Sequence, residues 1–270
     1  MADAVPRVNV PVAEVAVEAY RAVFGRLGLV LELSWLPLLV MLAAALIPGY
    51  LHFYLGWLAL PAWRGDDVGL TAEAVVEALA GLACLNAFAV RWHQAMLFAG
   101  ERQPPVGTFA RAWTRFVIYT LVIYLVSAAV MAMLVIADST GAGLYLMPLA
   151  AALAALLWIG MVRCSLLLPA AAFGRPLGIG AAWRTMRGNA WRLVGCGFVT
   201  CTPVLLIVIL ILSGIFTALQ LDQLGGRLPL GFFILRGVIA TCANFVVVAL
   251  GASILSAFYR RIVLRGLGVF

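Results

Sequence analysis

The sequence predicts an all-α polytopic membrane protein: a single membrane domain over residues 1–270 with six transmembrane helices. Apolar residues make up 65% of the chain and charged residues 11%, with a mean hydropathy of +1.10. A soluble domain exposes too much surface for that composition. Several uninterrupted apolar runs approach or exceed the roughly 20 residues that a helix needs to cross a bilayer, and the arginines cluster in alternate connections between them.

We predict spans at residues 27–47, 74–97, 116–137, 144–162, 193–219 and 237–259. The first follows a 26-residue amphipathic lead and is too long for a signal-peptide core, so we expect it to remain as a membrane anchor. The second carries Glu77 near one end and Arg91 and His93 near the other. It still reads as one span, because long arginine side chains can extend from the bilayer to the headgroups.

The distribution of arginine predicts the orientation of the chain. All 18 basic residues are arginine, and only Arg64, Arg227 and Arg236 fall on one side of the predicted spans. The other fifteen lie in the N-terminal lead, the second and fourth connections and the C-terminal tail. The positive-inside rule therefore predicts cytoplasmic N- and C-termini in a bacterial inner membrane. Charges placed at the membrane surface favour anionic phospholipid, and not nucleic acid, as the partner.

An internal threefold pattern accompanies the spans. Each even span ends in arginine and then glycine, in the stretches "VRWHQAMLFAGER" from Val90, "VRCSLLLPAAAFGR" from Val162 and "YRRIVLRG" from Tyr259. Each odd span follows an aromatic and arginine-bearing stretch, "AVEAYRAVFGR", "FARAWTRF" or "AAWRTMRGNAWR". We predict three hairpins, each preceded by a cytoplasmic interfacial amphipathic helix, and repeats at 12–105, 106–175 and 176–270. The alternative is a chance resemblance among arginine-rich membrane exits.

The interfacial segments are the predicted lipid contacts. In the first segment, one helical face carries Ala16, Tyr20, Val23, Phe24 and Leu27, and the other face carries Glu14, Glu18 and Arg21. We expect the apolar faces among the acyl chains and the arginines on lipid phosphates. The candidate headgroup contacts are Arg91, Trp92, Arg111, Trp113, Arg115, Arg163, Trp183, Arg184, Arg187, Trp191 and Arg192.

The triplet Arg91, Trp92 and His93 interrupts an apolar run and invites two interpretations. It is either an active site within a hydrophobic protein or the point where the second span meets the headgroups. Arginine beside tryptophan is an ordinary membrane anchor, and Gly100, Pro104 and Pro105 then break the helix. We therefore interpret the triplet as a membrane exit.

The stretch "FGRPLGIGAAWRTMRGNAWRLVG", Phe173 to Gly195, resembles a block in YciC-type bacterial inner-membrane proteins. It is also similar to the membrane domain attached to some bacterial glycerophosphodiester phosphodiesterases. In both, Arg-Pro-Leu, Ala-Trp-Arg and Asn-x-Trp-Arg precede a membrane helix. Only eleven residues follow Tyr259, so we expect no phosphodiesterase domain. The resemblance thus implies an inner-membrane protein of unassigned function and not an enzyme.

Polar residues within the spans are candidates for a buried cavity. Glu32 is either a proton or cation site or the ion-pair partner of Arg26 or Arg163, while Asn86 and Asn244 are expected to hydrogen-bond between helices. Small residues four positions apart predict helix contacts at Ala128/Ala132, Ala151/Ala155 and Ala252/Ser256. No motif for nucleophilic catalysis or metal binding is found in the sequence, so we expect no catalytic residues, metal or cofactor.

Two functional hypotheses follow. The first is a non-enzymatic scaffold, subunit or modulator of an envelope complex that contacts anionic lipid through its arginine-rich cytoplasmic side, with a membrane-protein partner or a second copy of itself. The second is a small transporter or lipid-handling conduit with a polar cavity between hairpins, lined by Glu32, Asn86 and Asn244.

Overall fold

The computed structural model describes residues 9–55, 72–98, 108–139, 143–175, 177–218 and 230–264. Within these ranges every regular element is helical: α1 (Val12–Phe24), α2 (Leu27–Leu55), α3 (Ala72–Leu97), α4 (Thr108–Ser139), α5 (Gly143–Cys164), α6 (Leu167–Ala172), α7 (Ile179–Thr185), α8 (Ala190–Ala218), α9 (Leu230–Tyr259) and the π-helical turn η2 (Arg260–Leu264).

Six helices are long and apolar enough to cross a membrane. The segments are Leu27–Ile47, Val75–Leu97, Phe109–Met133, Pro148–Ala172, Ala190–Thr217 and Ile234–Leu264. They correspond in order to the six predicted spans. The all-α class is therefore confirmed for the described residues, and the six candidate spans indicate a multi-pass membrane protein.

Proline and glycine set several of the helix boundaries. Pro11 has an extended backbone and directly precedes α1. Gly25 ends α1, and its N–H donates to the Arg21 carbonyl at 3.0 Å. A Cβ at position 25 would lie 2.5 Å from that oxygen, so only glycine fits there. Gly188, with a φ of +90°, occupies the left-handed region in the turn between α7 and α8.

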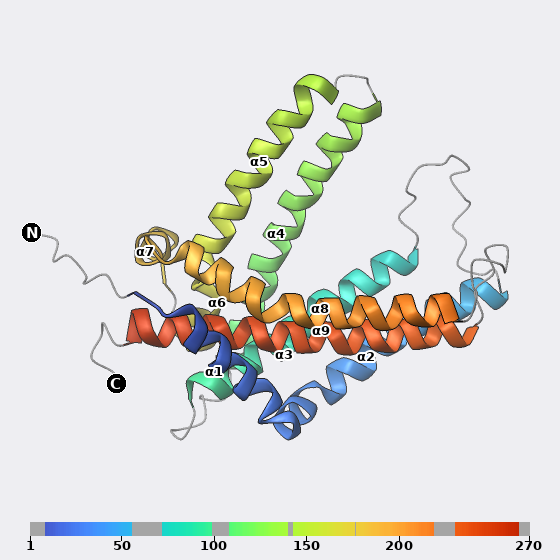
Figure 1. Cartoon of the computed structure of the whole chain (residues 1–270), viewed down its shortest axis with the longest axis horizontal. Helices are drawn as coiled ribbons and strands as arrows, with labels where there is room; N and C mark the ends of the chain where they lie inside the picture. The colour runs from blue at the N-terminus through green and yellow to red at the C-terminus, as the bar shows by residue number, and fades with distance from the viewer. Residues whose placement is uncertain are drawn as a thin grey trace, which may run out of the picture.

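Helices adjacent in the chain pack together: α2 on α3, α4 on α5 and α8 on α9. Helix α9 also contacts α1, α2, α3 and α6, which makes it the central helix of the molecule. Figure 1 shows α8 and α9 running side by side, while α4 and α5 lean away from them and meet them only near α6 and α7. The fold therefore has a fork where α5 and α8 diverge.

The core lies where α3 meets α9. Phe88 and Trp92 of α3 and Phe245 and Leu250 of α9 are buried, and the Phe88 ring meets the edge of Phe245 at 5.2 Å between centroids. Outside this core, many large apolar side chains of α2, α4, α5 and α8 are exposed, as acyl-chain contact requires.

Of the three pairs of small residues, one lies in a helix contact. Ala252 and Ser256 of α9 are both buried, and Ser256 faces α3. Ala128, Ala132, Ala151 and Ala155 are exposed on the outer surface of α4 and α5. Small residues four positions apart permit a close approach of helices, but tertiary packing decides whether another helix occupies that face.

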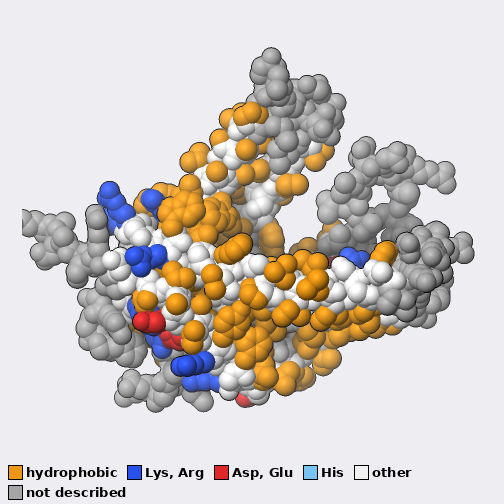
Figure 2. All heavy atoms as spheres, viewed as in Figure 1, with side chains coloured by type: hydrophobic (Ala, Val, Ile, Leu, Met, Phe, Trp, Pro, Cys, Tyr) orange, Lys and Arg blue, Asp and Glu red, His pale blue; other side chains and the backbone are white. Residues whose placement is uncertain are grey.

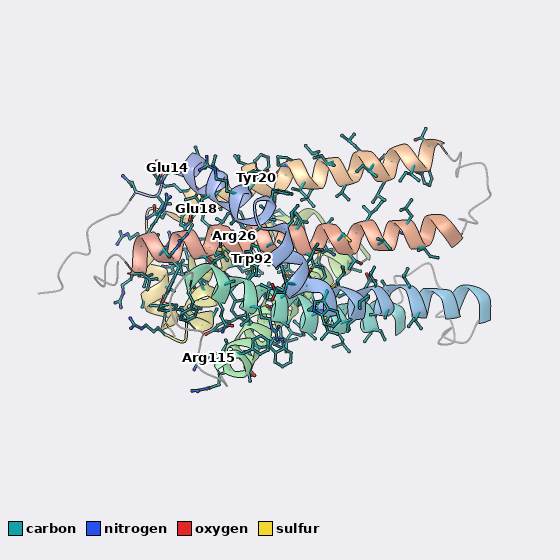
Figure 3. All side chains as sticks on the ribbon, turned by 90° about the horizontal axis from the view of Figure 1, so that it is seen from below. Glu14, Glu18, Tyr20, Arg26, Trp92 and Arg115 are labelled. Carbon is teal, nitrogen blue, oxygen red and sulfur yellow. The ribbon has the colours of Figure 1, made fainter. Side chains whose placement is uncertain are left out.

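One face of helix α1 is buried against other helices of the protein, where acyl chains were expected. The helix lies against α8 and α9 and crosses α9 in Figure 3. Tyr20, expected among acyl chains, donates its hydroxyl to the Thr200 carbonyl at 2.8 Å. The expectation of acyl-chain contact is therefore wrong for the buried part of this face, and only Phe24 and Leu27 remain about half exposed. The buried residues are Val15, Ala16, Ala19 and Val23.

The second predicted interfacial segment is not a separate helix. α4 begins at Thr108 and continues unbroken to Ser139, so Trp113 lies in the first turns of a long helix. Neither glycine nor proline interrupts the stretch from Thr108 to Phe116, which leaves nothing to stop the helix there. By contrast, α7 is a separate short helix, and the turn containing Gly188 sets it apart from α8.

Candidate functional site

Most arginines of the described chain lie at the ends of helices that meet beside α6 and α7. We call this region the arginine-rich end. It comprises Arg91 of α3, Arg111 and Arg115 of α4, Arg163 of α5, Arg175, Arg184 and Arg187 around α7, Arg192 of α8, and Arg260 and Arg261 of η2. Figure 2 shows basic side chains gathered over this end of the visible face.

Two of these arginines are neutralised by acidic residues of α1. Glu18 pairs with Arg260, and also with Arg261 at 3.2 Å between nitrogen and oxygen. Glu14 lies 3.4 Å from Arg261. Figure 3 shows Glu14 and Glu18 toward the start of α1, beside the end of α9. We call this cluster the α1–η2 clasp, and it fixes the first described helix to the last.

Arg192 has a structural contact of its own. Its guanidinium donates to the Val10 carbonyl at 3.1 Å, and the Val10 N–H donates to the Asn189 side-chain oxygen at 3.4 Å. The segment before α1 is thus held to the start of α8. Arg192 is half-buried and is used within the protein.

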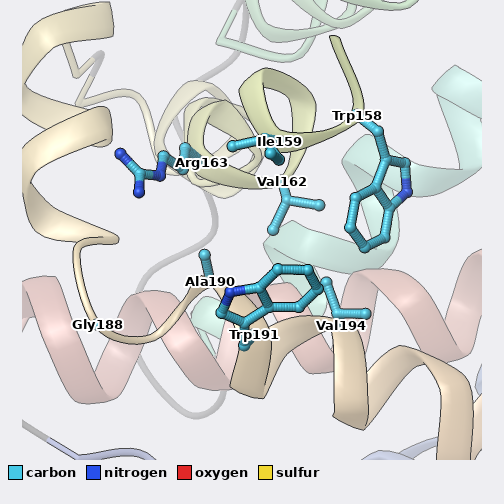
Figure 4. Close-up of a pocket in the computed structure, with 8 residues that line it drawn as sticks. All are labelled: Trp158, Ile159, Val162, Arg163, Gly188, Ala190, Trp191 and Val194. Atoms are coloured by element: carbon cyan, nitrogen blue, oxygen red, sulfur yellow. The ribbon is translucent and has the colours of Figure 1, made fainter. Parts of the chain in front are cut away.

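Two tryptophans and an arginine surround a cavity in the fork between α5 and α8. The rings of Trp158 and Trp191 lie 5.8 Å apart, and Trp191 is 72% exposed. The guanidinium carbon of Arg163 lies 4.6 Å from the ring centroid of Trp183 on α7. Figure 4 shows the two indoles reaching across from α5 and α8, with Gly188 at the turn below Arg163. We call this cavity the fork pocket, and its volume is about 130 Å³.

The predicted headgroup position of Trp92 is wrong, because its side chain is fully buried. Its indole N–H donates to the Ser253 hydroxyl at 2.8 Å, and Ser253 in turn donates to the Ala249 carbonyl. The next residue, His93, is also buried, and its Nδ1 lies 2.7 Å from the Ser256 hydroxyl. Both side chains are part of the seam between α3 and α9, so only Arg91 of the triplet reaches the surface.

Of the predicted headgroup contacts on α3 and α4 other than Trp92, some are exposed and others pack within the protein. Arg91 is exposed, with its guanidinium carbon 5.2 Å from the Phe109 ring centroid. The Trp113 indole N–H donates to the Ala83 carbonyl at 3.1 Å, so this tryptophan links α4 to α3. Arg111 is exposed and Arg115 is half-buried.

A second cavity, of about 270 Å³, lies between α3, α4, α6 and α9. We call it the polar cavity after Asn86, His93, Thr120 and Tyr124, although the other ten of its fourteen lining residues are apolar or glycine. Asn86 is buried, and its side-chain oxygen accepts a hydrogen bond from the Thr120 hydroxyl at 2.9 Å. The predicted interhelical hydrogen bond of Asn86 is therefore present.

Glu32 and Asn244 do not line this cavity. Both are exposed, which contradicts their predicted burial. The buried face of α2 carries Val30 and Ser34, and Glu32 lies about 200° from each around the helix. Within the described part of the chain, neither Arg26 nor Arg163 forms an ion pair with Glu32.

Sequence reasoning missed two sets of residues at this site. Ser253 and Ser256 hydrogen-bond the buried α3 residues, and only the small-residue spacing at Ser256 hinted at their position. The α1–η2 clasp joins residues more than 240 positions apart, for which no local pattern gives a signal. Among the described residues, no group of three or more His, Cys, Asp or Glu side chains is placed to hold a metal ion.

Comparisons with protein-family models, curated proteins and solved structures give no match to this chain. Its function is therefore inferred from the chemistry of the arginine-rich end and the two cavities.

Proposed function

We propose that this chain is a non-enzymatic integral protein of the bacterial inner membrane that contacts anionic phospholipid through its arginine-rich end. It serves as a scaffold, subunit or modulator of an envelope complex. Its spans form three hairpins, and both termini lie in the cytoplasm. The resemblance of Phe173–Gly195 to YciC-type proteins supports the same location.

One observation carries this proposal: exposed arginines and exposed indoles lie side by side. Arg184 and Arg187 are exposed at and just beyond the end of α7, next to the 40% exposed Trp183, and Trp191 lies in the first turn of α8. Arginine forms paired hydrogen bonds with phosphate, and tryptophan favours the boundary between headgroups and acyl chains. The acidic partners Glu14 and Glu18 are engaged with Arg260 and Arg261.

Native mass spectrometry of the detergent-purified protein with added phosphatidylglycerol tests this function. The Arg184→Gln/Arg187→Gln variant should lose affinity, because each arginine near an anionic surface contributes about 1 kcal/mol. Two such losses correspond to at most a roughly 30-fold drop in affinity. Arg236→Gln is the matched control, since Arg236 is exposed near the start of α9, whereas the arginines of the arginine-rich end that are nearest in sequence, Arg260 and Arg261, follow the last residue of that helix. Equal retention by all three proteins contradicts the proposal.

The polar cavity favours a second candidate, a small transporter or lipid-handling conduit. Asn86, His93, Thr120 and Tyr124 place uncharged polar groups in its largely apolar lining, at a site shared by α3, α4 and α9. Flux of a polar solute through reconstituted vesicles distinguishes this role. Asn86→Leu should abolish the flux while Glu32→Gln preserves it, because Glu32 lies outside the cavity. If the wild-type protein supports no flux, the transporter role is contradicted and the scaffold role is favoured.

A further inference from the structure

The fork pocket combines a cationic rim with apolar walls. Trp158, Ile159 and Val162 of α5 face Trp191 and Val194 of α8, and Arg163, Gly188 and Ala190 complete the lining. In Figure 4 the Arg163 side chain extends toward α7 and away from the two indoles. The pocket thus has a polar side at α7 and an apolar side that continues into the fork.

Among the described residues, Arg163 contacts the Trp183 ring and forms no hydrogen bond through its side chain. Its guanidinium stacks on the Trp183 ring, an arrangement that leaves the N–H groups in the guanidinium plane available. Its Nε atom is buried and has no hydrogen-bond partner within the described part of the chain. Buried donors in proteins are normally paired, and of the three such unpaired atoms among the described residues, Arg163 Nε, Thr200 Oγ1 and Arg260 Nε, only the first belongs to a residue of the fork pocket.

Within the described part of the chain, no carboxylate pairs with Arg163, and the ion pairs formed there join Glu14 and Glu18 to Arg260 and Arg261. Between Asp138 and Asp222 the sequence contains no acidic residue, whereas it contains five arginines, at positions 163, 175, 184, 187 and 192. An anion from outside the chain is therefore the complementary partner for this region.

The fork also defines the rest of the ligand. From the indoles onward, α5 and α8 present uncharged and mostly apolar side chains, among them the exposed Leu156 and Phe198. A small inorganic anion would leave this surface unmatched, whereas acyl chains would cover it.

We propose that the fork pocket binds one anionic phospholipid, with its phosphodiester on Arg163 and its acyl chains between α5 and α8. This inference rests on the proposed function and names its principal site. Trp158 and Trp191 form the apolar neck between headgroup and chains.

Native mass spectrometry with lipids of matched acyl chains tests the site. The wild-type protein should retain one phosphatidylglycerol in preference to phosphatidylcholine. Arg163→Gln should reduce phosphatidylglycerol affinity by about tenfold, as expected for loss of a charge-assisted contact, and leave phosphatidylcholine unchanged. Trp191→Ala should weaken both lipids, because the exposed indole contacts their apolar part. Soluble glycerol phosphate at equal concentration should not compete.

The controls distinguish the fork-pocket assignment from the proposed contact of the whole arginine-rich end with anionic phospholipid. Arg236→Gln removes an exposed arginine that lies outside the arginine-rich end, and it should bind phosphatidylglycerol like the wild type. Arg163→Lys should keep part of the preference, since it retains the charge. If the wild type shows no preference for the anionic lipid, the proposed function itself fails. If the wild type shows the preference and Arg163→Gln retains it, only the fork-pocket assignment is overturned. Full competition by glycerol phosphate also overturns it, in favour of a free phosphate site.

Discussion

The hydrogen bond between Trp92 and Ser253 should contribute measurably to stability, because it joins α3 to α9 at a fully buried position. The indole nitrogen lies 2.8 Å from the hydroxyl oxygen, and the hydroxyl proton is directed to the Ala249 carbonyl, so the geometry leaves an oxygen lone pair for the indole. The change to test is Trp92→Phe, which removes the donor and part of the ring. Ser253→Ala and the double variant complete a thermodynamic cycle.

The expected magnitudes follow from burial. Side-chain hydrogen bonds between membrane helices contribute about 0.6 kcal/mol on average and at most ~1.7 kcal/mol. Trp92→Phe also leaves a small cavity, so its total cost should be roughly 1–3 kcal/mol. Ser253→Ala strands the buried indole N–H, which costs about 1–3 kcal/mol. The coupling energy from the cycle should fall at roughly 0.6–1.7 kcal/mol.

Equilibrium unfolding in mixed micelles, followed by far-ultraviolet circular dichroism, measures these changes. Trp191→Phe is the matched control: Trp191 is 72% exposed, so its replacement should shift the unfolding free energy by less than about 0.5 kcal/mol. If Trp92→Phe is as mild as Trp191→Phe, or if the coupling energy is zero, then Trp92 does not lie in the α3–α9 seam. The headgroup interpretation of Trp92 would then be restored.

Three further changes probe other parts of the fold by the same unfolding measurement. Glu18→Gln should lower stability by about 0.5–1 kcal/mol at low salt and by less at high salt, because the pairs with Arg260 and Arg261 are partly exposed; equal losses at both salt concentrations would argue against the clasp. Gly237→Ala should stabilise the protein by much less than the roughly 1 kcal/mol by which alanine usually exceeds glycine in a helix, because the new methyl would lie 3.3 Å from the side chain of Leu46 on α2. A stabilisation of the full ~1 kcal/mol would contradict that close approach. Asn86→Leu should cost about 0.6 kcal/mol through its lost partner on α4, and a stabilised protein would show that this bond does not form.

The spans were predictable because they depend on composition and length alone. The predicted limits 27–47 and 74–97 nearly coincide with the segments Leu27–Ile47 and Val75–Leu97. Hydropathy shows how far an apolar run extends, and the thickness of the bilayer sets the length that a spanning run needs.

Whether each helix face contacts lipid or another helix was not predictable from the sequence in the same way. An amphipathic helix such as α1 shows that one face is covered, but lipid and protein both satisfy the same apolar pattern. Trp92 beside an arginine likewise resembles an interfacial anchor, and only its angular position relative to α9 places it in the core. Glu32 and Asn244 were expected inside because polar groups in a span usually find protein partners, yet both lie on outward faces of their helices.

The most direct test of the account is the side of the membrane on which the arginine-rich end lies. A cysteine introduced by Arg187→Cys, at an exposed position in the turn after α7, can be treated with a membrane-impermeant maleimide and located by peptide mass spectrometry. The account predicts labelling at this position in inverted inner-membrane vesicles and none in intact spheroplasts. Labelling in spheroplasts but not in inverted vesicles would place the arginines on the outer face and contradict the account.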